Sequence, residues 1–259
     1  MRVCLTIAGS DSLAGAGIQA DLKTFSGLKV YGTSVITSVT AQNTLGVQSI
    51  HDLPPDFIRI QLQSILTDIK VDSAKVGMLS QKGAVEVVGQ TLHECGMENL
   101  VIDPIMVSKG GAVLLAEDGR RSLKEMLLPI AKIVTPNIYE ASWLSGVNIT
   151  GVDDMKRAAE IIHKSGVEWI LVKGGHLEER VLDILYDGEK MEVLDTNGSR
   201  WEEVHGTGCI LSAAIAANLA KGLDVREAVN QAKSYLREVM SGAVKIGKGW
   251  KVAPQHELV

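Results

Sequence analysis

The chain has 259 residues, 46% of them hydrophobic, which is enough apolar sequence for one large α/β domain and argues against a disordered chain. Its formal net charge is −5 with both signs mixed along the sequence, and this argues against a nucleic acid partner, because phosphate backbones bind a basic face. The three scattered cysteines argue against a disulfide framework, and no apolar run reaches membrane-spanning length, so we expect a cytoplasmic protein with no membrane partner.

Short runs rich in valine and isoleucine alternate with segments of helical period from residue 2 to residue 173. The expected strands are Arg2–Ala8, Ser34–Thr40, Ala74–Val76, Leu100–Asp103, Lys132–Thr135 and Trp169–Lys173. The expected helices are Ile18–Leu28, Pro55–Thr67, Lys82–Glu94, Glu117–Leu127, Tyr139–Leu144 and Asp154–Lys164. Strands separated by helices predict βαβ units, and apolar runs without alternation predict strands buried on both faces of a parallel sheet.

The pattern changes after Lys173. Two short apolar runs, Val181–Tyr186 and Lys190–Asp195, flank a turn that contains Gly188 and predict a β-hairpin. Two helices, Thr207–Lys221 and Asp224–Met240, close the chain. No linker or repeat interrupts the sequence, so we expect residues 1–259 to form a single α/β domain, with a mostly parallel central sheet, helices on both faces and a late β-hairpin.

Ligands of open α/β sheets bind beyond the carboxyl ends of the strands, so the residues that follow each strand carry the functional argument. The first strand ends in a loop of small residues from Gly9 to Gly17. This loop is similar to a dinucleotide fingerprint, but Leu13 and Ala14 occupy its middle and break the G-x-G-x-x-G spacing. Asp21, one turn into the next helix, can face a pocket at the helix start.

Gln42 and Asn43 follow the second strand. Their amides can hydrogen-bond both edges of a heteroaromatic ring, or they can satisfy the backbone of a turn, and the second reading fits Asn43 better than Gln42.

Carboxylates follow two later strands. Asp103 ends one strand just before Pro104, and Glu140 lies three residues after Asn137 at the start of a helix. The spacing of Asn137 and Glu140 is that of a capping box. Alternatively, Asp103, Asn137 and Glu140 are oxygen donors near Mg²⁺, reached through water molecules because Mg²⁺ keeps several of them.

A lysine and a glycine-rich helix start complete the set. Lys173, followed by Gly174, Gly175 and His176, can reach phosphate oxygens, or it is simply a solvated residue before a turn. Gly206-Thr207-Gly208-Cys209 opens a helix, where free backbone N–H groups and the helix dipole can hold an anion; alternatively it is a tight entry to a core helix.

Cys209 lies in the first turn of that helix, a position that lowers the pKa of a thiol and predicts a general base for a substrate hydroxyl. The alternative is a buried small hydrophobic residue. The sequence holds neither the P-loop pattern nor the motif set of protein kinases, so a nucleotide site here is of another kind.

Together these segments resemble the ribokinase-like superfamily and, within it, the hydroxymethylpyrimidine/phosphomethylpyrimidine kinases of thiamine biosynthesis. The segments that carry the resemblance, in the family's order, are residues 5–11 (LTIAGSD), 15–25 (GAGIQADLKTF), 40–44 (TAQNT), 75–79 (KVGML), 103–107 (DPIMV), 135–137 (TPN), 173–176 (KGGH) and 205–209 (HGTGC). The resemblance implies a three-layer sandwich and a homodimer. It also implies ATP and Mg²⁺ as cofactors and a small pyrimidine as substrate.

The resemblance also implies roles for single residues. The residues expected to line the pyrimidine pocket are Gly9, Ala16, Asp21, Gln42, Met78 and Ile105, of which Asp21 and Gln42 should pair with the ring. The residues expected to form an anion hole around the transferred phosphoryl group are Gly206, Thr207, Gly208 and Cys209, with Cys209 in the place of the aspartate base of sugar kinases. Lys173 should contact the ATP phosphates. The residues expected near Mg²⁺ are Asp103, Asn137 and Glu140, with Asp103 and Glu140 binding it through water.

Two segments depart from the family's pattern. Members commonly read Pro-Ser-Gly-Gly-Ala-Gly in the first loop, where this chain has Ser12-Leu13-Ala14-Gly15-Ala16-Gly17, which should stiffen the loop over the substrate. The glycine- and proline-rich segment near the C-terminus is reduced to residues 246–254 (IGKGWKVAP), which leaves the adenine contacts open.

The expected reaction is therefore ATP-dependent phosphorylation of 4-amino-5-hydroxymethyl-2-methylpyrimidine, and then of its monophosphate to the diphosphate. A pyridoxine or pyridoxal kinase is the nearest alternative, because these enzymes share the Gly-Thr-Gly-Cys arrangement. Cys209 disfavours a sugar kinase. A non-catalytic pyrimidine-sensing module is disfavoured by the retained Asp103, Glu140, Lys173 and Cys209.

Overall fold

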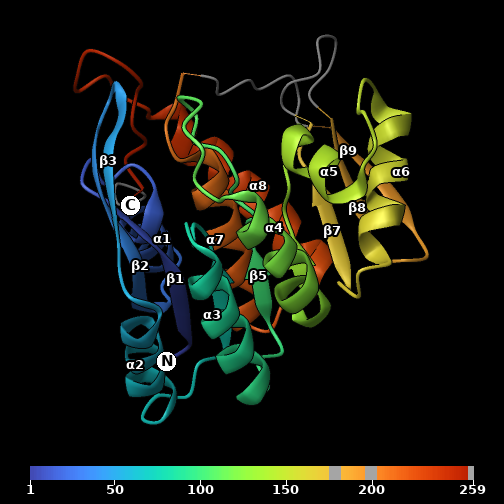
Figure 1. The fold of residues 1–259 in the computed structure, drawn as a ribbon. Coiled ribbons are helices and arrows are strands. Elements are labelled where there is room, and N and C mark those ends of the chain that lie inside the picture. Colours follow the sequence, from blue (N-terminus) through green and yellow to red (C-terminus); the bar gives the residue numbers. More distant parts are fainter. Residues whose placement is uncertain (175–181, 196–202, 256–259) are drawn as a thin grey trace.

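The computed structural model describes residues 1–174, 182–195 and 203–255, and a nine-stranded sheet runs through this part of the chain (Figure 1). The strands, in the order in which they lie in the sheet, are β3 (Gly46–Asp52), β2 (Tyr31–Asn43), β1 (Val3–Asp11), β4 (Ser73–Val76), β5 (Leu100–Ile102), β6 (Ile133–Val134), β7 (Trp169–Val172), β8 (Leu182–Tyr186) and β9 (Met191–Asp195). Neighbours from β2 to β7 are parallel. The pairs at the two ends of the sheet are antiparallel.

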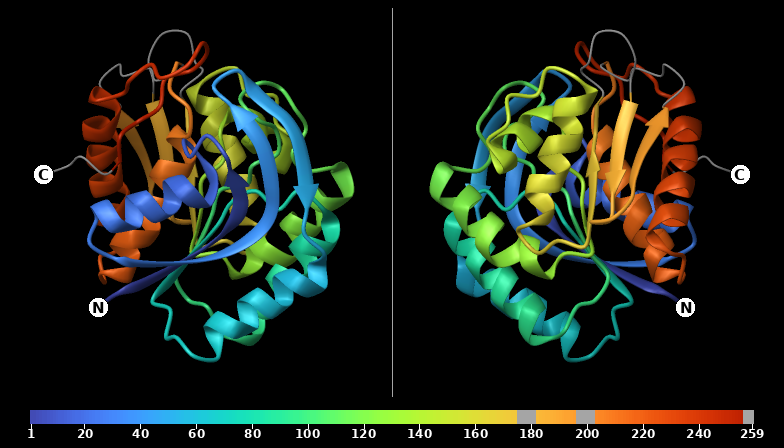
Figure 2. Two further views of the ribbon diagram at one scale, coloured as in Figure 1. Left: turned by 90° about the vertical axis from the view of Figure 1, so that its left-hand side faces the viewer. Right: turned by 90° about the vertical axis from the view of Figure 1, so that its right-hand side faces the viewer.

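Helices cover both faces of the sheet and make three layers (Figure 2). One face carries α1 (Gly17–Gly27), α7 (Thr207–Ala220) and α8 (Val225–Ser241). The other face carries α2 (Pro55–Leu66), α3 (Lys82–Glu94), α4 (Glu117–Ser122), α5 (Ile138–Ser145) and α6 (Val152–His163). The predicted mostly parallel α/β sandwich is confirmed.

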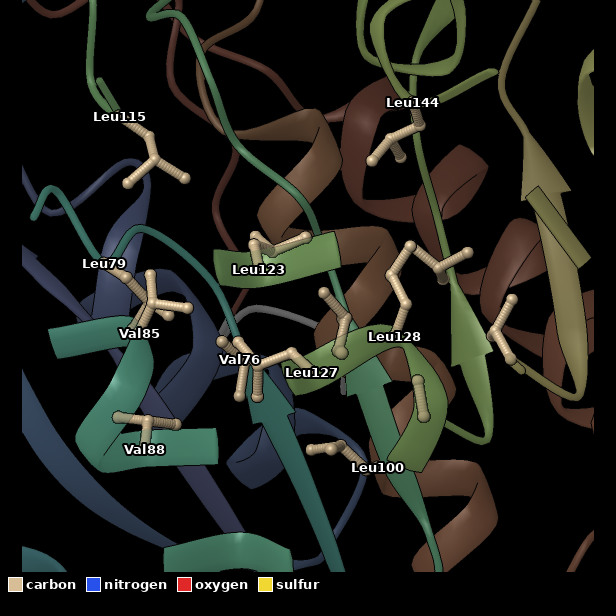
Figure 3. Close-up of a cluster of buried hydrophobic side chains, with 14 of the residues drawn as sticks. Val76, Leu79, Val85, Val88, Leu100, Leu115, Leu123, Leu127, Leu128 and Leu144 are labelled. Carbon is tan, nitrogen blue, oxygen red and sulfur yellow. The ribbon is translucent and has the colours of Figure 1, made fainter. Parts of the chain in front are cut away.

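Side chains of the central strands alternate between two hydrophobic cores. Leu100 and Ile102 of β5 point into the core beneath α2–α6, whereas Val101 between them points into the core beneath α7 and α8. Part of the first core is drawn in Figure 3, where Val76 and Leu100 of neighbouring strands lie beneath α3 and the segment around Leu127. Strands buried on both faces explain why their sequences are continuously apolar.

Two local features differ from the prediction. β3 was not predicted: this edge strand is largely exposed, so it lacks the apolar pattern that marks a buried strand. The predicted helix Glu117–Leu127 is α4 followed by a π-helical turn, Leu123–Leu127, and a 3₁₀ turn, Leu128–Ile130. Pro129 lacks a backbone N–H and cannot continue an α-helix at this point.

The late hairpin and the two closing helices are confirmed. β8 and β9 pair in antiparallel register from Leu182 opposite Asp195 to Tyr186 opposite Met191, while Val181, predicted to start the hairpin, lies outside the described residues. Within residues 1–174, 182–195 and 203–255, no helix combines the length and the apolar composition needed to span a bilayer. A single domain over residues 1–259 stays a prediction.

Candidate active site

A cavity of about 1030 Å³ opens where the carboxyl ends of the parallel strands meet. The segments that follow β1, β4, β5, β6 and β7 contribute to its wall, together with the end of β2, the start of β3 and the start of α7. The predicted site residues that line it are Gly9, Ala16, Gln42, Met78, Asp103, Ile105, Asn137, Glu140, Lys173, Gly206, Thr207, Gly208 and Cys209. The sheet therefore gathers into one cavity residues that are up to 200 positions apart in the sequence, from Gly9 to Cys209.

The start of α7 forms a backbone cradle. Gly206 is the N-cap of this helix with a φ of 85°, a left-handed conformation that favours glycine, and a Cβ there would collide with the carbonyl of Gly15. Gly206 therefore lets the α7 start pack directly on the loop after β1. The backbone N–H groups of the first helical turn have no partner within the helix and point to where an anion binds.

Lys173 and Asp103 lie directly against this cradle. Lys173 Nζ is 3.0 Å from Asp103 Oδ1, and a Cβ added to Gly208 would lie 3.4 Å from Asp103 Oδ2 and 3.5 Å from Lys173 Nζ. Thr135 Oγ1 also donates to Asp103. Burial opposes ionisation of Asp103, but the ammonium groups of Lys173 and Lys75 hold its pKa below the ordinary value. The cradle thus faces one ionised carboxylate and the lysine ammonium group paired with it.

Asn137 and Glu140 form the predicted capping box at the start of α5. Asn137 Oδ1 accepts from the Glu140 backbone N–H at 2.9 Å, and Glu140 Oε2 accepts from the Asn137 N–H at 2.8 Å. Burial raises the pKa of Glu140 to about 7; Lys173 opposes this shift and Asp103 adds to it. Both side chains also line the cavity, and their place near Mg²⁺ stays a prediction. Hard oxygen donors of this kind suit Mg²⁺.

Cys209 departs from the sequence expectation. Its thiol is 7% exposed at the floor of the cavity, and burial raises its pKa to about 11, although Lys75 pulls in the opposite direction. The prediction of a thiol with a lowered pKa is therefore wrong, because burial outweighs the effect of the helix start. At neutral pH the thiol keeps its proton.

Asp21 also lies elsewhere than predicted: it is completely buried and is absent from the cavity wall. Its carboxylate accepts from Lys75 Nζ at 2.8 and 3.1 Å and from Thr6 Oγ1 at 2.6 Å. Lys75 is completely buried too, and although burial opposes it, the Asp21 carboxylate raises the pKa of Lys75. Lys75 reaches the cavity wall in place of Asp21.

Sequence reasoning missed Lys75, although a signal was present. A lysine inside β4, a strand buried on both faces, needs a buried counter-charge, and this requirement pointed to a carboxylate close by in the fold. The sequence did not say which carboxylate.

Gln42 lies in the cavity wall at the end of β2, but its amide already has a protein neighbour. Gln42 Nε2 is 2.7 Å from His205 Nε2, and the same ring nitrogen is 3.1 Å from Asp11 Oδ2. Neither His205 nor Asp11 was predicted as a site residue, although both lie in segments that carry the family resemblance. Asn43 Oδ1 accepts from the Leu45 N–H, so Asn43 serves the turn as expected.

The far end of the cavity is closed by α8. Lys233 Nζ is 2.7 Å from Asp183 Oδ2, and Asp183 Oδ1 accepts from the Gly174 N–H at 3.0 Å, one residue after Lys173. This pair ties α8 to β8 and to the loop that carries Lys173, and nothing in the sequence pattern singled it out. Gly175 and His176 of the predicted lysine motif lie outside the described residues.

Comparisons with known proteins agree on one family. A family model described as phosphomethylpyrimidine kinase matches residues 11–254. The hydroxymethylpyrimidine/phosphomethylpyrimidine kinase of Bacillus subtilis is 42% identical over 247 residues, which cover 95% of this chain and 91% of that protein. The crystal structure of phosphomethylpyrimidine kinase from Clostridium difficile 630 superimposes with a TM-score of 0.84 at 43% identity, covering 92% of this chain and 99% of that one.

A second solved structure comes from a kinase with another name. The ADP complex of Bacillus subtilis pyridoxal kinase superimposes with a TM-score of 0.91 at 39% identity, covering 100% of this chain and 98% of that one. The cavity, the cradle and the Lys173–Asp103 pair therefore occur in a chain whose fold matches kinases of both kinds.

Proposed function

The chain belongs to the phosphomethylpyrimidine kinase family, and we propose that it transfers the γ-phosphoryl group of ATP to the hydroxymethyl oxygen of 4-amino-5-hydroxymethyl-2-methylpyrimidine. The product of this step then accepts a second phosphoryl group on its phosphate, which gives the diphosphate used in thiamine biosynthesis. The observation that supports this proposal most strongly is the α7 cradle, which shares one cavity with the Lys173–Asp103 pair and with the residues expected to line the pyrimidine pocket.

Part of the cavity lining suits a flat, polar-edged ring. Met78 and Ile105 supply apolar walls, and Gln42 supplies an amide at the edge. A Cβ on Gly9 would lie 2.9 Å from Ser38 Oγ and 3.0 Å from Met78 Cε, so the wall at this point has no room for a side chain and Met78 can pack close to the backbone. Asp21 does not line the cavity, but its carboxylate binds the Lys75 ammonium group, and Lys75 does line it.

On the phosphate side, the chain supplies positioning and charge. The N–H groups at the start of α7 and the Lys173 ammonium bind phosphoryl oxygens, and Asp103 keeps Lys173 oriented between them. Asp103 and Glu140 would hold Mg²⁺, partly through water, with Asn137 beside them. Mg²⁺, when bound, neutralises charge on the transferred phosphoryl group.

Cys209 orients the acceptor in this scheme and does not act as a base. A loose phosphoryl-transfer transition state leaves the proton on the attacking hydroxyl until late, so a strong base is not required. The protonated Cys209 thiol orients the hydroxymethyl group beside the cradle, and the hydroxyl proton passes late to an oxygen of the transferred phosphoryl group. Lys75 lies close enough to Cys209 to oppose the rise in its pKa that burial causes.

A pyridoxal kinase is the second candidate, and it is favoured by the fit to the Bacillus subtilis pyridoxal kinase over the whole chain. Pyridoxal also carries a hydroxymethyl group on a heteroaromatic ring, so the same cradle and thiol serve it. The homodimer and the cytoplasmic location expected from the sequence also remain proposals.

One assay separates the candidates. ADP release is measured side by side with the hydroxymethylpyrimidine, its monophosphate, pyridoxal and ribose, each with MgATP. We expect release with the first two. Release with pyridoxal alone would transfer the assignment to pyridoxal kinase, and no release with any acceptor would favour the sensing module.

A further inference from the structure

A short flap after β5 forms part of the cavity wall. It consists of residues 107–113, whose end residues form an antiparallel bridge, and the Ser108 N–H donates to the Ala112 carbonyl at 2.8 Å. The tip of the flap is Lys109-Gly110-Gly111, and every residue of the flap except Ala112 lines the cavity. Because two of the three tip residues are glycines, the tip has little conformational preference of its own and depends on its neighbours for a fixed position.

A strap from the C-terminal part of the chain, residues 244–252, runs beside the turn between β2 and β3 (Figure 1). The Trp250 N–H donates to the Thr44 carbonyl in this turn at 2.9 Å. The His205 N–H donates to the Lys251 carbonyl, also at 2.9 Å. The strap is therefore bound on one side to the β2–β3 turn and on the other to the residue that precedes the α7 cradle.

The indole of Trp250 joins the flap to this strap. It stacks on the His205 ring, with centroids 5.8 Å apart and planes inclined by 13°. Lys109 Nζ lies 6.0 Å from the centre of the indole and donates to the Val204 carbonyl at 2.8 Å. A Cβ added to Gly110 would lie 3.4 Å from Trp250 Cη2, at the far corner of the indole. One side chain of the strap thus lies against both the flap tip and the segment before α7.

This corner of the cavity is where the substrate ring is proposed to bind. Gln42, which is expected to line the pyrimidine pocket, has its Nε2 2.7 Å from Nε2 of the His205 ring on which Trp250 stacks. A flap that is displaced in part of the molecules lowers the apparent affinity for the ring by the fraction that remains in place. A residue that holds the flap in the free protein therefore strengthens substrate binding without contacting the reacting atoms.

We propose that Trp250 is a positioning residue, whose indole holds the flap of residues 107–113 in place before the substrate ring arrives. The family resemblance does not imply this anchor, because Trp250 lies in the segment that departs from the family's glycine- and proline-rich pattern. The inference deepens the proposed function and rests on it for the identity of the bound ring. The anchoring itself is a property of the free protein.

Limited proteolysis of the free protein measures how often the flap leaves its place. Trypsin cleaves after Lys109 at the flap tip, and mass spectrometry identifies this cut by the fragments 1–109 and 110–259. The rate of such a cut follows the population of the opened segment. Trp250→Ala should accelerate it about three- to tenfold, while a cut after Arg157 in α6 reports global unfolding and should keep its rate. An unchanged rate at Lys109 would overturn the inference, whatever the enzyme phosphorylates.

Two further variants separate the reach of the indole from a general effect on the strap. Trp250→Phe keeps a ring on His205 but is too short to place an atom at the position of Cη2, so the cut at Lys109 should again be faster than in wild type. Ile246→Ala removes a 64% exposed side chain of the same strap and should leave the rate unchanged. A wild-type rate for Trp250→Phe, or acceleration by Ile246→Ala equal to that of Trp250→Ala, would contradict the proposal.

Gly110→Ala completes a double-mutant cycle between the flap and the indole. The added methyl group would be in van der Waals contact with Trp250 Cη2, so it should slow the cut at least about twofold in wild type and have a smaller effect in the Trp250→Ala background. Effects of the alanine on trypsin and on the unfolded chain are common to both backgrounds and cancel. Equal effects in the two backgrounds would show that flap and indole are not coupled.

Steady-state kinetics connect the anchor with the substrate. For Trp250→Ala we expect KM for 4-amino-5-hydroxymethyl-2-methylpyrimidine to rise about two- to tenfold and kcat to change less than about twofold, because the anchor orders the flap and takes no part in the transfer step. A fall in kcat with KM unchanged would contradict the inference. If wild type does not phosphorylate the pyrimidine while the cut at Lys109 still depends on Trp250, the proposed function is wrong and the flap anchor is confirmed.

Discussion

Burial changes the acid–base properties of single residues in this cavity. Cys209 and Glu140 both become weaker acids because they are buried, and the lysines around them only partly offset this. Asp103 is also buried but becomes a stronger acid, because Lys173 lies within hydrogen-bonding distance. The difference between these residues is set by neighbours that are distant in the sequence, so it could not be predicted from helix position alone.

The neutral thiol of Cys209 leads to a kinetic prediction. Cys209→Ala should lower kcat about 10²- to 10³-fold with little change in KM for the pyrimidine, which is the usual effect of removing a group aimed at the reacting oxygen. Steady-state kinetics measure this, and Cys95→Ala, at an exposed thiol on the far end of α3, serves as the control. Turnover near the wild-type value would remove Cys209 from the reaction.

The raised pKa of Glu140 predicts how stability depends on pH. Between its ordinary value of 4.5 and about 7, the folded protein holds a proton on Glu140 that the unfolded chain has lost. The free energy of unfolding should therefore fall as pH rises through this range, by about 3 kcal/mol at most from this group. Glu140→Gln keeps a side-chain oxygen that accepts the capping-box hydrogen bond and removes the titratable carboxyl group.

Urea denaturation from pH 4.5 to 8 tests this prediction. The Glu140→Gln variant should gain stability relative to wild type as pH rises through the window, and the gain should level off above pH about 7. A constant difference between the two proteins across the range would show that Glu140 titrates normally.

Ala14 stores strain in the loop over the substrate. Its φ is 62°, a left-handed conformation that favours glycine, and its backbone N–H donates to the Asp11 carbonyl at 2.9 Å. Lys23 Nζ holds its carbonyl at 2.9 Å. This alanine stands where the resembled family commonly has a glycine. The loop therefore keeps a left-handed backbone conformation at a residue that is less flexible than glycine.

Ala14→Gly should relieve the backbone strain but also increase the conformational entropy of the unfolded chain. The net effect should raise the free energy of unfolding by up to about 1 kcal/mol. Because the glycine also loosens the loop, KM for the pyrimidine should rise a few-fold. Lys29→Gly, at a φ of 60° on an exposed site, should give the same gain in stability with KM unchanged. Thermal unfolding and steady-state kinetics of both variants check this, and a matching KM change in both would contradict it.

At the scale of elements, the hydrophobic periodicity of the sequence predicted most of the helices and strands. The strands and helices of the βαβ units appear near their predicted bounds, because strands buried on both faces and amphipathic helices leave clear patterns. The exposed edge strand β3 and the interrupted helix after α4 were missed, because an exposed edge has little apolar signal and the interruption depends on Pro129 and local packing.

The link between α8 and β8 provides a test at this scale. Lys233 and Asp183 are both nearly buried, so Lys233→Met leaves an unpaired buried carboxylate and should cost about 3–5 kcal/mol of unfolding free energy. Lys156→Met, which removes the exposed partner of Asp153, should cost less than about 1 kcal/mol. Equal costs in urea denaturation would mean that the buried pair is not what ties α8 to the sheet.

At the scale of the whole molecule, the position of the site followed from topology. Residues after successive parallel strands meet at one edge of a sheet, and this rule brought thirteen of the fourteen predicted residues to a single cavity, all but Asp21. The pairs behind the wall were not predictable in the same way. Asp21 with Lys75 and Asp11 with His205 are joined by contacts between residues far apart in the chain, and one sequence contains no record of such pairing.

In the proposed reaction, the α7 cradle of the assembled cavity serves two successive phosphoryl acceptors. A ³¹P NMR time course of the purified protein with MgATP and 4-amino-5-hydroxymethyl-2-methylpyrimidine follows both transfers. We expect the signal of a phosphomonoester to appear first and to be replaced by the two coupled signals of a diphosphate. An unchanged ATP spectrum with the pyrimidine, together with formation of pyridoxal phosphate when pyridoxal is supplied, would contradict the account.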